Sequence, residues 1–431
     1  MTYEQALNYI LSFPRFGKSG DSSRIGKLLK LLGNPHKKLK FIHVAGTNGK
    51  GSVCALLSAA LSAMGYQTGL FISPFITDFR ERVQINGTLV SRELLTKAAE
   101  KIKACAYKVC PDGGFCSFEI ITAAAFLCFE AKKCDIVVLE TGVGGLHDCT
   151  NIIDPPVCSV LTTISLDHTQ ILGNTVCEIA REKCGIIKKN SHVVSAAQSK
   201  EAENEIIKAA AGQNCTLNFS SEITLQEVKH SFEGISYLYS GQRITQKLIG
   251  VFQEENAKTA LKTLEVISDC GFKTDIGAVA RGFGNAVNPA RFEILGTNPP
   301  LILDGAHNPN GLEALGRSLQ TYLGGRKAIG LIAMLGDKDF QNGISVLKDV
   351  LDCVYLTEVE NNLRTLSAEE LFGSTDGIFP RVYCEQNMRA AFDKAYALCK
   401  KENRPLVVCG SLYLASRLRP YIIQTAGNTQ V

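Results

Sequence analysis

A short apolar segment that leads into a glycine-rich loop constrains the fold of this chain most strongly. Residues 41–45 have the sequence Phe-Ile-His-Val-Ala, which is typical of a strand buried in a parallel sheet. The loop Gly-Thr-Asn-Gly-Lys-Gly-Ser follows at residues 46–52, and residues 53–64 have the apolar spacing of a helix. This order predicts a phosphate-binding loop, because glycines let backbone N–H groups approach phosphates and the positive end of the helix points at the same place.

Lys50 strengthens this prediction, because its charge can reach the terminal phosphates of a nucleotide. The loop departs from the common pattern G-x-x-x-x-G-K-[ST]. Val44 stands four residues before Asn48, and Gly51 separates Lys50 from Ser52. The alternative interpretation is a glycine-rich turn with a solvated lysine. A dinucleotide-binding loop is not expected, because this segment lacks the pattern G-x-G-x-x-G.

The chain continues to alternate strands with helices, which predicts an α/β fold with a mostly parallel sheet. Helices are expected at residues 3–13, 25–32, 94–106 and 120–131, and strands at residues 135–140, 157–164 and 192–196. Residues 232–252 differ, because they alternate with period two around Ser240-Gly241. That pattern predicts an antiparallel hairpin.

A polar, proline-rich stretch at residues 296–300 predicts a domain boundary. Residues 1–296 then form a P-loop-type domain, and residues 297–431 form a smaller, Rossmann-like α/β domain. In the second domain, strands are expected at residues 301–303, 328–334, 354–357, 381–384 and 406–409. A length of 431 residues accommodates two domains of these sizes.

Composition narrows the class of protein further. The formal net charge of +4 gives no reason to expect a nucleic-acid or membrane partner. No apolar run approaches the roughly 18 residues of a membrane span, and polar residues interrupt the N-terminus where a signal peptide is apolar. The 16 cysteines are scattered without a C-x-x-C pair, which indicates reduced thiols rather than a zinc site. We expect a cytoplasmic protein.

Polar residues follow several of the expected strands, where α/β sheets place ligands. Glu140 ends the strand 135–140 and enters a glycine turn, so it is a candidate ligand for the Mg²⁺ that accompanies a nucleotide. Asp304 follows a strand in the second domain and precedes His307. Asp304 can accept ribose hydroxyls and His307 can meet a phosphate or base, although an Asn-Pro turn with a capping aspartate is the alternative.

Three further residues are ambiguous when judged by their chemistry alone. His168 follows a strand together with Asp167, but imidazole is an unusual ligand for Mg²⁺. Ser73 follows the apolar residues 70–72 and is more typical of a turn. Lys183 lies in a helical segment, where a solvated lysine is the ordinary interpretation.

Five motifs in one order resemble the folylpolyglutamate synthase group of the Mur ligase superfamily, which includes bifunctional dihydrofolate synthases. They are residues 46–52, 140–145, 167–168, 182–183 and 304–309. The resemblance extends over nearly the whole chain, and it implies Mg²⁺ as cofactor and ATP as substrate. It also reverses the interpretations of Ser73, His168 and Lys183 that chemistry alone favours.

The resemblance implies a role for each matching residue. The implied ATP contacts are Thr47, Asn48, Gly49, Lys50, Gly51, Ser52, Asn256, Arg291, Asp304 and His307. The implied Mg²⁺ ligands are Ser73, Glu140, His168 and Lys183, the last as a carbamate formed with CO₂. The implied lining of a pteroate pocket is Ser117, Phe118, Glu119 and Asp148, and the implied catalytic residues are Lys50, Lys183 and His168.

The function implied is an ATP-dependent ligase that adds L-glutamate to the γ-carboxyl of tetrahydrofolate through an acyl phosphate. Its partners would be ATP, L-glutamate and a reduced folate, with neither nucleic acid nor membrane, and we expect a monomer. Dihydrofolate synthase activity on dihydropteroate is the additional function considered. Residues 19–25 lack the Leu-Gly-Leu-Glu-Arg segment associated with that activity, and resemble members that only extend the glutamate tail.

Two other functions remain as alternatives. The first is a Mur-type ligase that adds an amino acid to a cell-wall precursor. Gly51 argues against it, because those ligases resemble Gly-Lys followed directly by Thr or Ser. The second is an ATP-binding switch protein without ligase chemistry, which would release no phosphate when an acceptor and glutamate are added.

Overall fold

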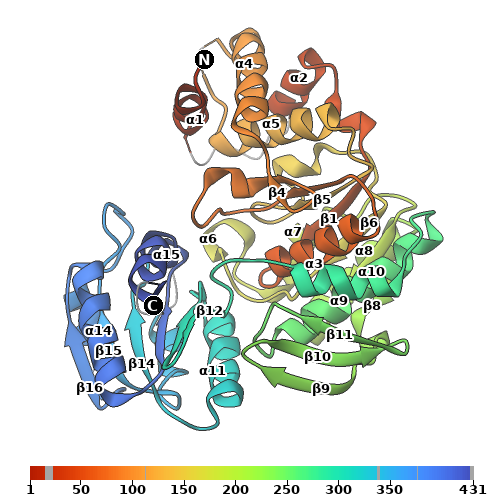
Figure 1. The fold of residues 1–431 in the computed structure, drawn as a ribbon. Coiled ribbons are helices and arrows are strands. Elements are labelled where there is room, and N and C mark those ends of the chain that lie inside the picture. Colours follow the sequence, from red (N-terminus) through yellow and green to blue (C-terminus); the bar gives the residue numbers. More distant parts are fainter. Residues whose placement is uncertain (15–22, 112, 337–339, 376, 428–431) are drawn as a thin grey trace.

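Two α/β domains, each built on a largely parallel sheet, make up the chain in the computed structural model (Figure 1). The structure describes residues 1–14, 23–111, 113–336, 340–375 and 377–427. The segment 19–25, which bears on dihydropteroate binding, therefore lies mostly outside the described residues. Within the described part of the chain, no helix has the length and apolar character needed to cross a membrane.

The first domain contains an eight-stranded sheet with the order β4-β3-β2-β5-β1-β6-β7-β8. Its parallel strands are β1 (Phe41–Ala45), β2 (Thr68–Phe71), β5 (Ile136–Glu140), β6 (Cys158–Leu161), β7 (His192–Ser195) and β8 (Thr216–Phe219). The antiparallel edge is formed by β3 (Val83–Ile85) and β4 (Thr88–Leu89). Because β1 lies between β5 and β6, the loops that follow these three strands meet at one edge of the sheet.

Alternating side chains of the central strands bury both faces of this sheet. Ile42 and Val44 of β1 point into the core formed with α3 (Lys50–Ala63), α9 (Gln253–Asp269) and α10 (Ile276–Asn285). Phe41 belongs to the core on the opposite face. The helices on that side are α1 (Tyr3–Leu11), α2 (Ser23–Leu31), α4 (Arg92–Val109) and α5 (Ser117–Ala131), at the top of Figure 1. A sheet covered by helices on both faces explains why its strands are apolar throughout.

Helices and a small sheet complete the first domain. Beside β6 and β7 lie α6 (Thr169–Leu172), α7 (Val176–Cys184) and α8 (Lys200–Gly212). The predicted hairpin is confirmed as β10 (Gly234–Tyr239) and β11 (Gln242–Gln246), with Ser240 and Gly241 at positive φ in its turn. A third strand, β9 (Gln226–Ser231), extends it, and its largely exposed, polar residues gave no apolar pattern in the sequence.

The second domain has a six-stranded sheet with the order β12-β13-β17-β14-β15-β16. Its strands are β12 (Glu293–Thr297), β13 (Pro300–Leu303), β14 (Ala328–Ile332), β15 (Leu351–Leu356), β16 (Arg381–Cys384) and β17 (Leu406–Cys409). One face packs on α11 (Pro309–Leu323) and α12 (Phe340–Ser345), and the other on α14 (Met388–Glu402) and α15 (Leu412–Gly427). A short helix, α13 (Ala368–Ser374), precedes β16.

The stretch proposed from the sequence as the domain boundary lies within the second sheet. Residues 296–300, taken from the sequence as the boundary, form the turn between β12 and β13, which pair antiparallel. Because β12 already belongs to the second sheet, residues 286–292 connect the domains. The expected strands and helices are otherwise present, and all 16 cysteines are free thiols.

The helix that follows the glycine loop is held in place by close contact with α10. A Cβ atom built on Gly282 would lie 2.5 Å from Ala60 Cα and 2.6 Å from Ala60 N. These are backbone atoms of α3, so a rotamer change cannot relieve the overlap. Only glycine at position 282 lets the two helices approach this closely.

We predict that Gly282→Ala lowers the free energy of unfolding by about 1–3 kcal/mol, because α10 must move away from α3. Gly277→Ala in the same helix is the matched control, since its Cβ meets its nearest atom at an ordinary 3.6 Å. Chemical denaturation measures both effects. Equal stability of the two variants would contradict the packing described for Gly282.

Candidate functional site

The glycine loop is shaped by contacts that leave no room for side chains. A Cβ on Gly46 would lie 1.8 Å from Thr162 Oγ1, and one on Gly49 would lie 2.4 Å from Asn256 Oδ1. Gly49 also has a φ of 91° at the N-cap of α3, a conformation that favours glycine. The loop is thereby pressed between the end of β6 and the start of α9.

The N–H groups that could hold an anion are those at the start of α3 rather than those of the whole loop. The N–H groups of Thr47 and Asn48 both donate to Thr163 O, at 2.8 and 3.2 Å. The first-turn N–H groups of a helix have no partner within the helix, and the helix dipole makes this end positive. Residues 49–52 are therefore where the loop can hold an anion.

Two lysines from distant parts of the chain donate to the same backbone oxygen. Lys50 Nζ donates to Gly46 O at 3.0 Å and to Thr47 O at 3.2 Å. Lys183 Nζ, supplied by α7, donates to Gly46 O at 2.7 Å. Lys183 is only 4 % exposed, so the interpretation of a solvated lysine, based on its chemistry alone, is wrong.

The environment of Lys183 favours its neutral amine. Burial lowers the pKa of Lys183 to about 7, and the charge of Lys50 contributes in the same direction. The carboxylates of Asp167, Asp148 and Glu182 act against this shift. Near neutral pH a large fraction of the Lys183 side chain is thus an uncharged amine, which can act as a nucleophile.

Glu140 is a buried carboxylate among cations. Its Oε2 accepts a hydrogen bond from the backbone N–H of Ser73 at 2.8 Å, and the residue is 3 % exposed. Burial raises its pKa, whereas the nearby charges of Lys50, Arg291 and Arg82 favour the ionised form. Among the described residues, no cluster of three or more His, Cys, Asp and Glu side chains could hold a metal ion. A metal at Glu140 would therefore need ligands from the phosphates themselves.

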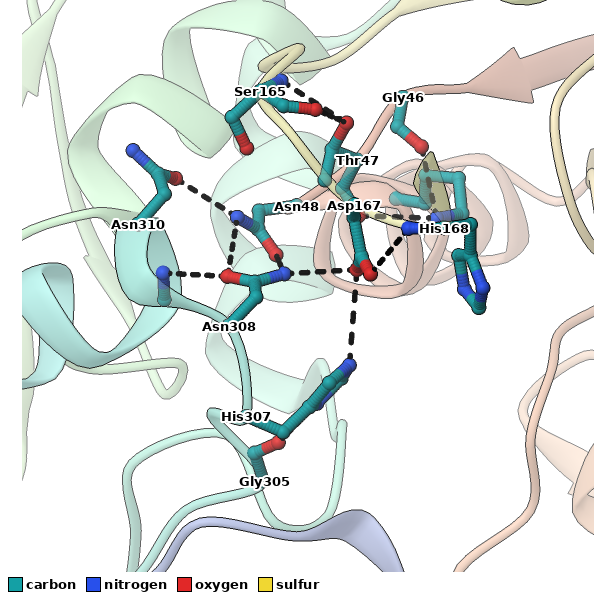
Figure 2. Close-up of polar contacts among 12 residues, drawn as sticks. Gly46, Thr47, Asn48, Ser165, Asp167, His168, Gly305, His307, Asn308 and Asn310 are labelled. Atoms are coloured by element: carbon teal, nitrogen blue, oxygen red, sulfur yellow. Dashed lines mark hydrogen bonds and ion pairs between the residues drawn. The ribbon is translucent and has the colours of Figure 1, made fainter. Parts of the chain in front are cut away.

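His168 and Asp167 lie beside the glycine loop (Figure 2). The side chain of His168 is exposed, and its backbone N–H donates to Asp167 Oδ1 at 2.8 Å. Asp167 Oδ2 accepts from Asn308 Nδ2 at 2.9 Å and lies 3.8 Å from His307 Nε2. Asp167 therefore joins the first domain to the start of α11 in the second.

A second polar connection between the domains starts from the loop itself. Asn48 Nδ2 donates to Asn310 Oδ1 at 2.8 Å, and its contacts with the Asn308 carboxamide are longer, at 3.3 and 3.4 Å (Figure 2). Neither Asn308 nor Asn310 was among the site residues predicted from the sequence. The signal available was Asn308-Pro309 before a helix, which is a helix start, and Asn308 Oδ1 does cap α11 by accepting from Gly311 N–H at 2.8 Å.

Arg291 lies in the segment that connects the two domains, and Asp304 directly follows β13. Asp304 is buried and accepts hydrogen bonds from the N–H groups of Phe292 and Ala306, both at 2.7 Å. Burial raises the pKa of Asp304, and the charge of Arg291 opposes this shift. Arg291 therefore acts electrostatically on both Asp304 and Glu140, which links the two domains through one guanidinium group.

Ser52 and Asn256 are held by side-chain amides, of which Gln253 is buried and Asn288 half-buried. Ser52 Oγ accepts from Gln253 Nε2 at 3.1 Å and from Asn288 Nδ2 at 3.2 Å. Asn256 Nδ2 donates to Gln253 Oε1 at 2.9 Å. The structure thus brings both predicted residues to the loop, and it adds Gln253, which the sequence analysis did not select.

The residues predicted to line a pteroate pocket gather around the glycine turn after β5. Asp148 accepts from the N–H groups of Gly142 and Val143 at 2.9 and 3.0 Å, and from the N–H and hydroxyl of Thr150 at 2.9 and 2.6 Å. Four donors satisfy this buried carboxylate, so it holds the turn. The Phe118 ring leaves no space for a Cβ at Gly142, which it would meet at 2.5 Å.

The two remaining members of this set lie at the start of α5. Glu119 is 4 % exposed; its Oε2 accepts from the Cys116 N–H at 2.8 Å, and its Oε1 lies 3.6 Å from Arg24 Nε. The Ser117 N–H donates to Pro14 O at 2.8 Å. These contacts fix the helix start, and contact with a substrate stays a prediction for all four residues.

Comparison with known proteins gives matches to both domains. Residues 44–264 match the Mur ligase middle domain, and residues 290–412 match the family described as Mur ligase, glutamate ligase domain. A folylpolyglutamate synthase from Lacticaseibacillus casei is 33% identical over 436 residues, covering 98% of this chain and 99% of that protein. A dihydrofolate synthase/folylpolyglutamate synthase from Bacillus subtilis is 33% identical over 433 residues, covering 97% of this chain and 98% of that protein.

A solved structure is similar over the same length. The folylpolyglutamate synthase of Mycobacterium tuberculosis in complex with ADP superposes with a TM-score of 0.90 at 29% identity. The match covers 97% of this chain and 98% of that one.

The lowered pKa of Lys183 gives a pH-dependent prediction. The pKa of the Lys183 amine is about 10.4 in the unfolded chain, whereas it is about 7 in the folded chain. To fold, the chain must therefore either remove the proton from Lys183 or bury its charge, and both lower the free energy of unfolding. This loss of stability is greatest below the pKa of the folded state, and it disappears as the pH rises to the pKa of the unfolded state. We predict that Lys183→Met stabilises the chain more at about pH 6 than at about pH 10.

Chemical denaturation of both proteins in CO₂-depleted buffer measures this difference. Lys189→Met, which replaces an exposed lysine nearby, should change stability equally at both pH values. A pH-independent effect of Lys183→Met would show that the buried amine does not titrate near neutrality.

Proposed function

This chain belongs to the folylpolyglutamate synthase family of the Mur ligases, and we propose that it uses ATP to couple L-glutamate to the γ-carboxyl of tetrahydrofolate. The observation that carries the proposal is the convergence of Lys50 and Lys183 on the carbonyl oxygen of Gly46, beside the buried Glu140. Together with the start of α3, the charge of Lys50 favours an anionic ligand such as a nucleotide triphosphate.

The reaction we propose has two steps. In the first, an oxygen of the folate γ-carboxylate attacks the γ-phosphorus of ATP, the bond to the β–γ bridging oxygen breaks, and ADP leaves. Lys50 stabilises the charge on the transferred group, so catalysis is mainly positioning and electrostatics. In the second, the glutamate amine attacks the acyl carbon, loses a proton, and the tetrahedral intermediate releases phosphate to leave the amide.

Mg²⁺ fits this set of residues through Glu140, a carboxylate at the end of β5 next to the loop. We propose Ser73 and His168 as its further ligands, with the ATP phosphates completing the set. Bound there, it would neutralise phosphate charge during transfer. The backbone N–H of Ser73 already orients the Glu140 carboxylate by donating to it.

We further propose that Lys183 carries a carbamate. Its buried amine has a pKa of about 7, so it is largely neutral at physiological pH and can add to CO₂ with loss of a proton. The product is an anion with two oxygens. It would place a carboxylate-like ligand beside Lys50 at Gly46, where a protonated Lys183 would repel Lys50.

Thr47 to Ser52, Asn256, Arg291, Asp304 and His307 are proposed as the ATP contacts, and Ser117, Phe118, Glu119 and Asp148 as the pteroate contacts. Both domains of one chain supply the site, which supports a monomer. All 16 cysteines are free thiols, as is typical of the reducing cytoplasm. We therefore propose a cytoplasmic monomer.

Dihydropteroate is a second candidate acceptor. The similar Bacillus subtilis protein is named for both activities, which favours testing it. The segment that bears on this choice lies mostly outside the described residues. Phosphate release with ATP and L-glutamate, measured with dihydropteroate and with tetrahydrofolate in parallel, separates the two functions. The same assay excludes a switch protein if phosphate release depends on the acceptor.

We predict that Lys50→Ala reduces tetrahydrofolate-dependent phosphate release by about 100-fold or more, because the charge on the transferred phosphoryl group loses its partner. Lys401→Ala removes an exposed lysine and should leave the rate unchanged. Circular dichroism checks that both variants are folded. A Lys50→Ala protein as active as the wild type would remove the assignment of the phosphate loop.

For the carbamate, we predict that Lys183→Ala abolishes ligation and that acetate in the assay restores part of the activity. A small carboxylate can occupy the space of the missing group and supply its oxygens. Lys189→Ala is the control and should show neither loss nor rescue. If acetate and chloride at equal ionic strength act alike, or if Lys183→Ala stays active, the carbamate proposal fails.

A further inference from the structure

Of the side-chain hydrogen bonds that join Asn48 of the phosphate loop to the second domain, the one to Asn310 is the shortest. Asn48, which precedes Gly49 and Lys50 in the loop, donates from Nδ2 to Asn310 Oδ1 at 2.8 Å (Figure 2). Asn310 is the second residue of α11 and is half-buried. The bond therefore connects the place where a phosphate binds to the first turn of a helix in the other domain.

The side chain of the neighbouring Asn308 makes other hydrogen bonds. Its Oδ1 caps α11 through Gly311 N–H at 2.8 Å, and its Nδ2 donates to Asp167 at 2.9 Å. Its contacts with Asn48 are long, at 3.3 and 3.4 Å. Asn310 has no part in the cap, so its side chain can be altered while the helix start stays intact.

Movement of this helix start means movement of the second domain. Leu312, Leu315 and Leu319 of α11 are almost fully buried against the sheet of that domain. A 15-residue helix packed in this way is a rigid part of the domain. A contact at its first turn is therefore one of those that fix the distance between the second domain and the phosphate loop, together with Asn308–Asp167 and the contacts of α15 with residues 76–77.

This distance matters for the fate of an acyl phosphate. If the glutamate amine attacks the acyl carbon, a C–N bond forms and phosphate leaves. If water attacks instead, the free carboxylic acid and phosphate result, and ATP is consumed without product. Closed domains exclude the water.

We propose that Asn310 is a positioning residue for the ligation, because its bond to Asn48 holds the second domain against the phosphate loop while the acyl phosphate awaits the amine. This inference rests on the proposed function. Asn310 acts through Asn48 and the loop. Its role is to keep the number of ATP molecules consumed equal to the number of amides formed.

The test measures phosphate release and incorporation of labelled glutamate in one reaction with tetrahydrofolate as acceptor. In Asn310→Ala, glutamate incorporation should fall about tenfold because the amine is no longer held in line. Phosphate release should fall less, so the variant releases more than one phosphate per amide formed. A purely structural role would lower both rates equally and keep the ratio of phosphate released to glutamate incorporated at one.

Two matched variants accompany it. Asn310→Asp keeps an oxygen that accepts from Asn48 Nδ2, and should keep phosphate release and incorporation equal. Gln320→Ala removes an exposed carboxamide from the same helix and should change neither rate. If Asn310→Ala does not fold, Asn310→Ser replaces it, since the shorter hydroxyl side chain cannot reach the Asn48 amide.

The outcomes separate this inference from the proposed function. An active wild type with a fully coupled Asn310→Ala protein overturns the role of Asn310 alone. A wild type that releases no phosphate in response to an acceptor overturns the proposed function itself. Excess phosphate release by Asn310→Ala, with coupling kept in Asn310→Asp, supports the inference.

Discussion

The carbonyl oxygen of Gly46 is the point on which the site depends. Gly46 directly follows β1, one of the two central strands of the first sheet, and its oxygen accepts hydrogen bonds from Lys50 of α3 and Lys183 of α7. Two ammonium groups on one oxygen repel each other, so the arrangement favours loss of one proton or the arrival of an anion. Burial, together with the charge of Lys50, lowers the pKa of Lys183 to about 7.

The residues around the Gly46 carbonyl oxygen fit the same constraint. Thr162 lies too close to Gly46 for any side chain at position 46, so the loop can pass over the sheet edge only as glycine. Glu140 ends the neighbouring strand and offers negative charge, while Arg291 brings positive charge from the domain connection. Anion binding is therefore a property of the fold at this edge and of both domains together.

Much of this could be predicted from the sequence, because parallel strands buried on both faces form short apolar runs and the glycine loop follows one of them. The polar strand β9 and the short edge strands β3 and β4 have no such pattern. The turn between β12 and β13 contains Asn298 and Pro299, and its composition resembles that of a linker.

The site was harder to predict wherever it depends on tertiary contacts. Burial of Lys183 follows from where α7 packs, and a helical lysine has the same local sequence whether it is exposed or buried. The contact of Asn310 with Asn48 depends on how two domains meet, which no local pattern encodes. Resemblance to a family located Lys183, whereas nothing in the sequence pointed to Asn310.

Helix α11 touches the first domain at both of its ends. Near its start, Asn310 meets the phosphate loop; twelve residues later, Tyr322 accepts from Gly250 N–H at 3.1 Å and contacts His230 Nδ1 at the same distance. At 1.5 Å per residue, these two anchors lie about 18 Å apart along the helix. A rotation of the second domain about α11 would break the contacts that Ser416 and Arg419 of α15 make with Ile76 O and Thr77 Oγ1 of the first domain, so α11 and α15 together fix the second domain.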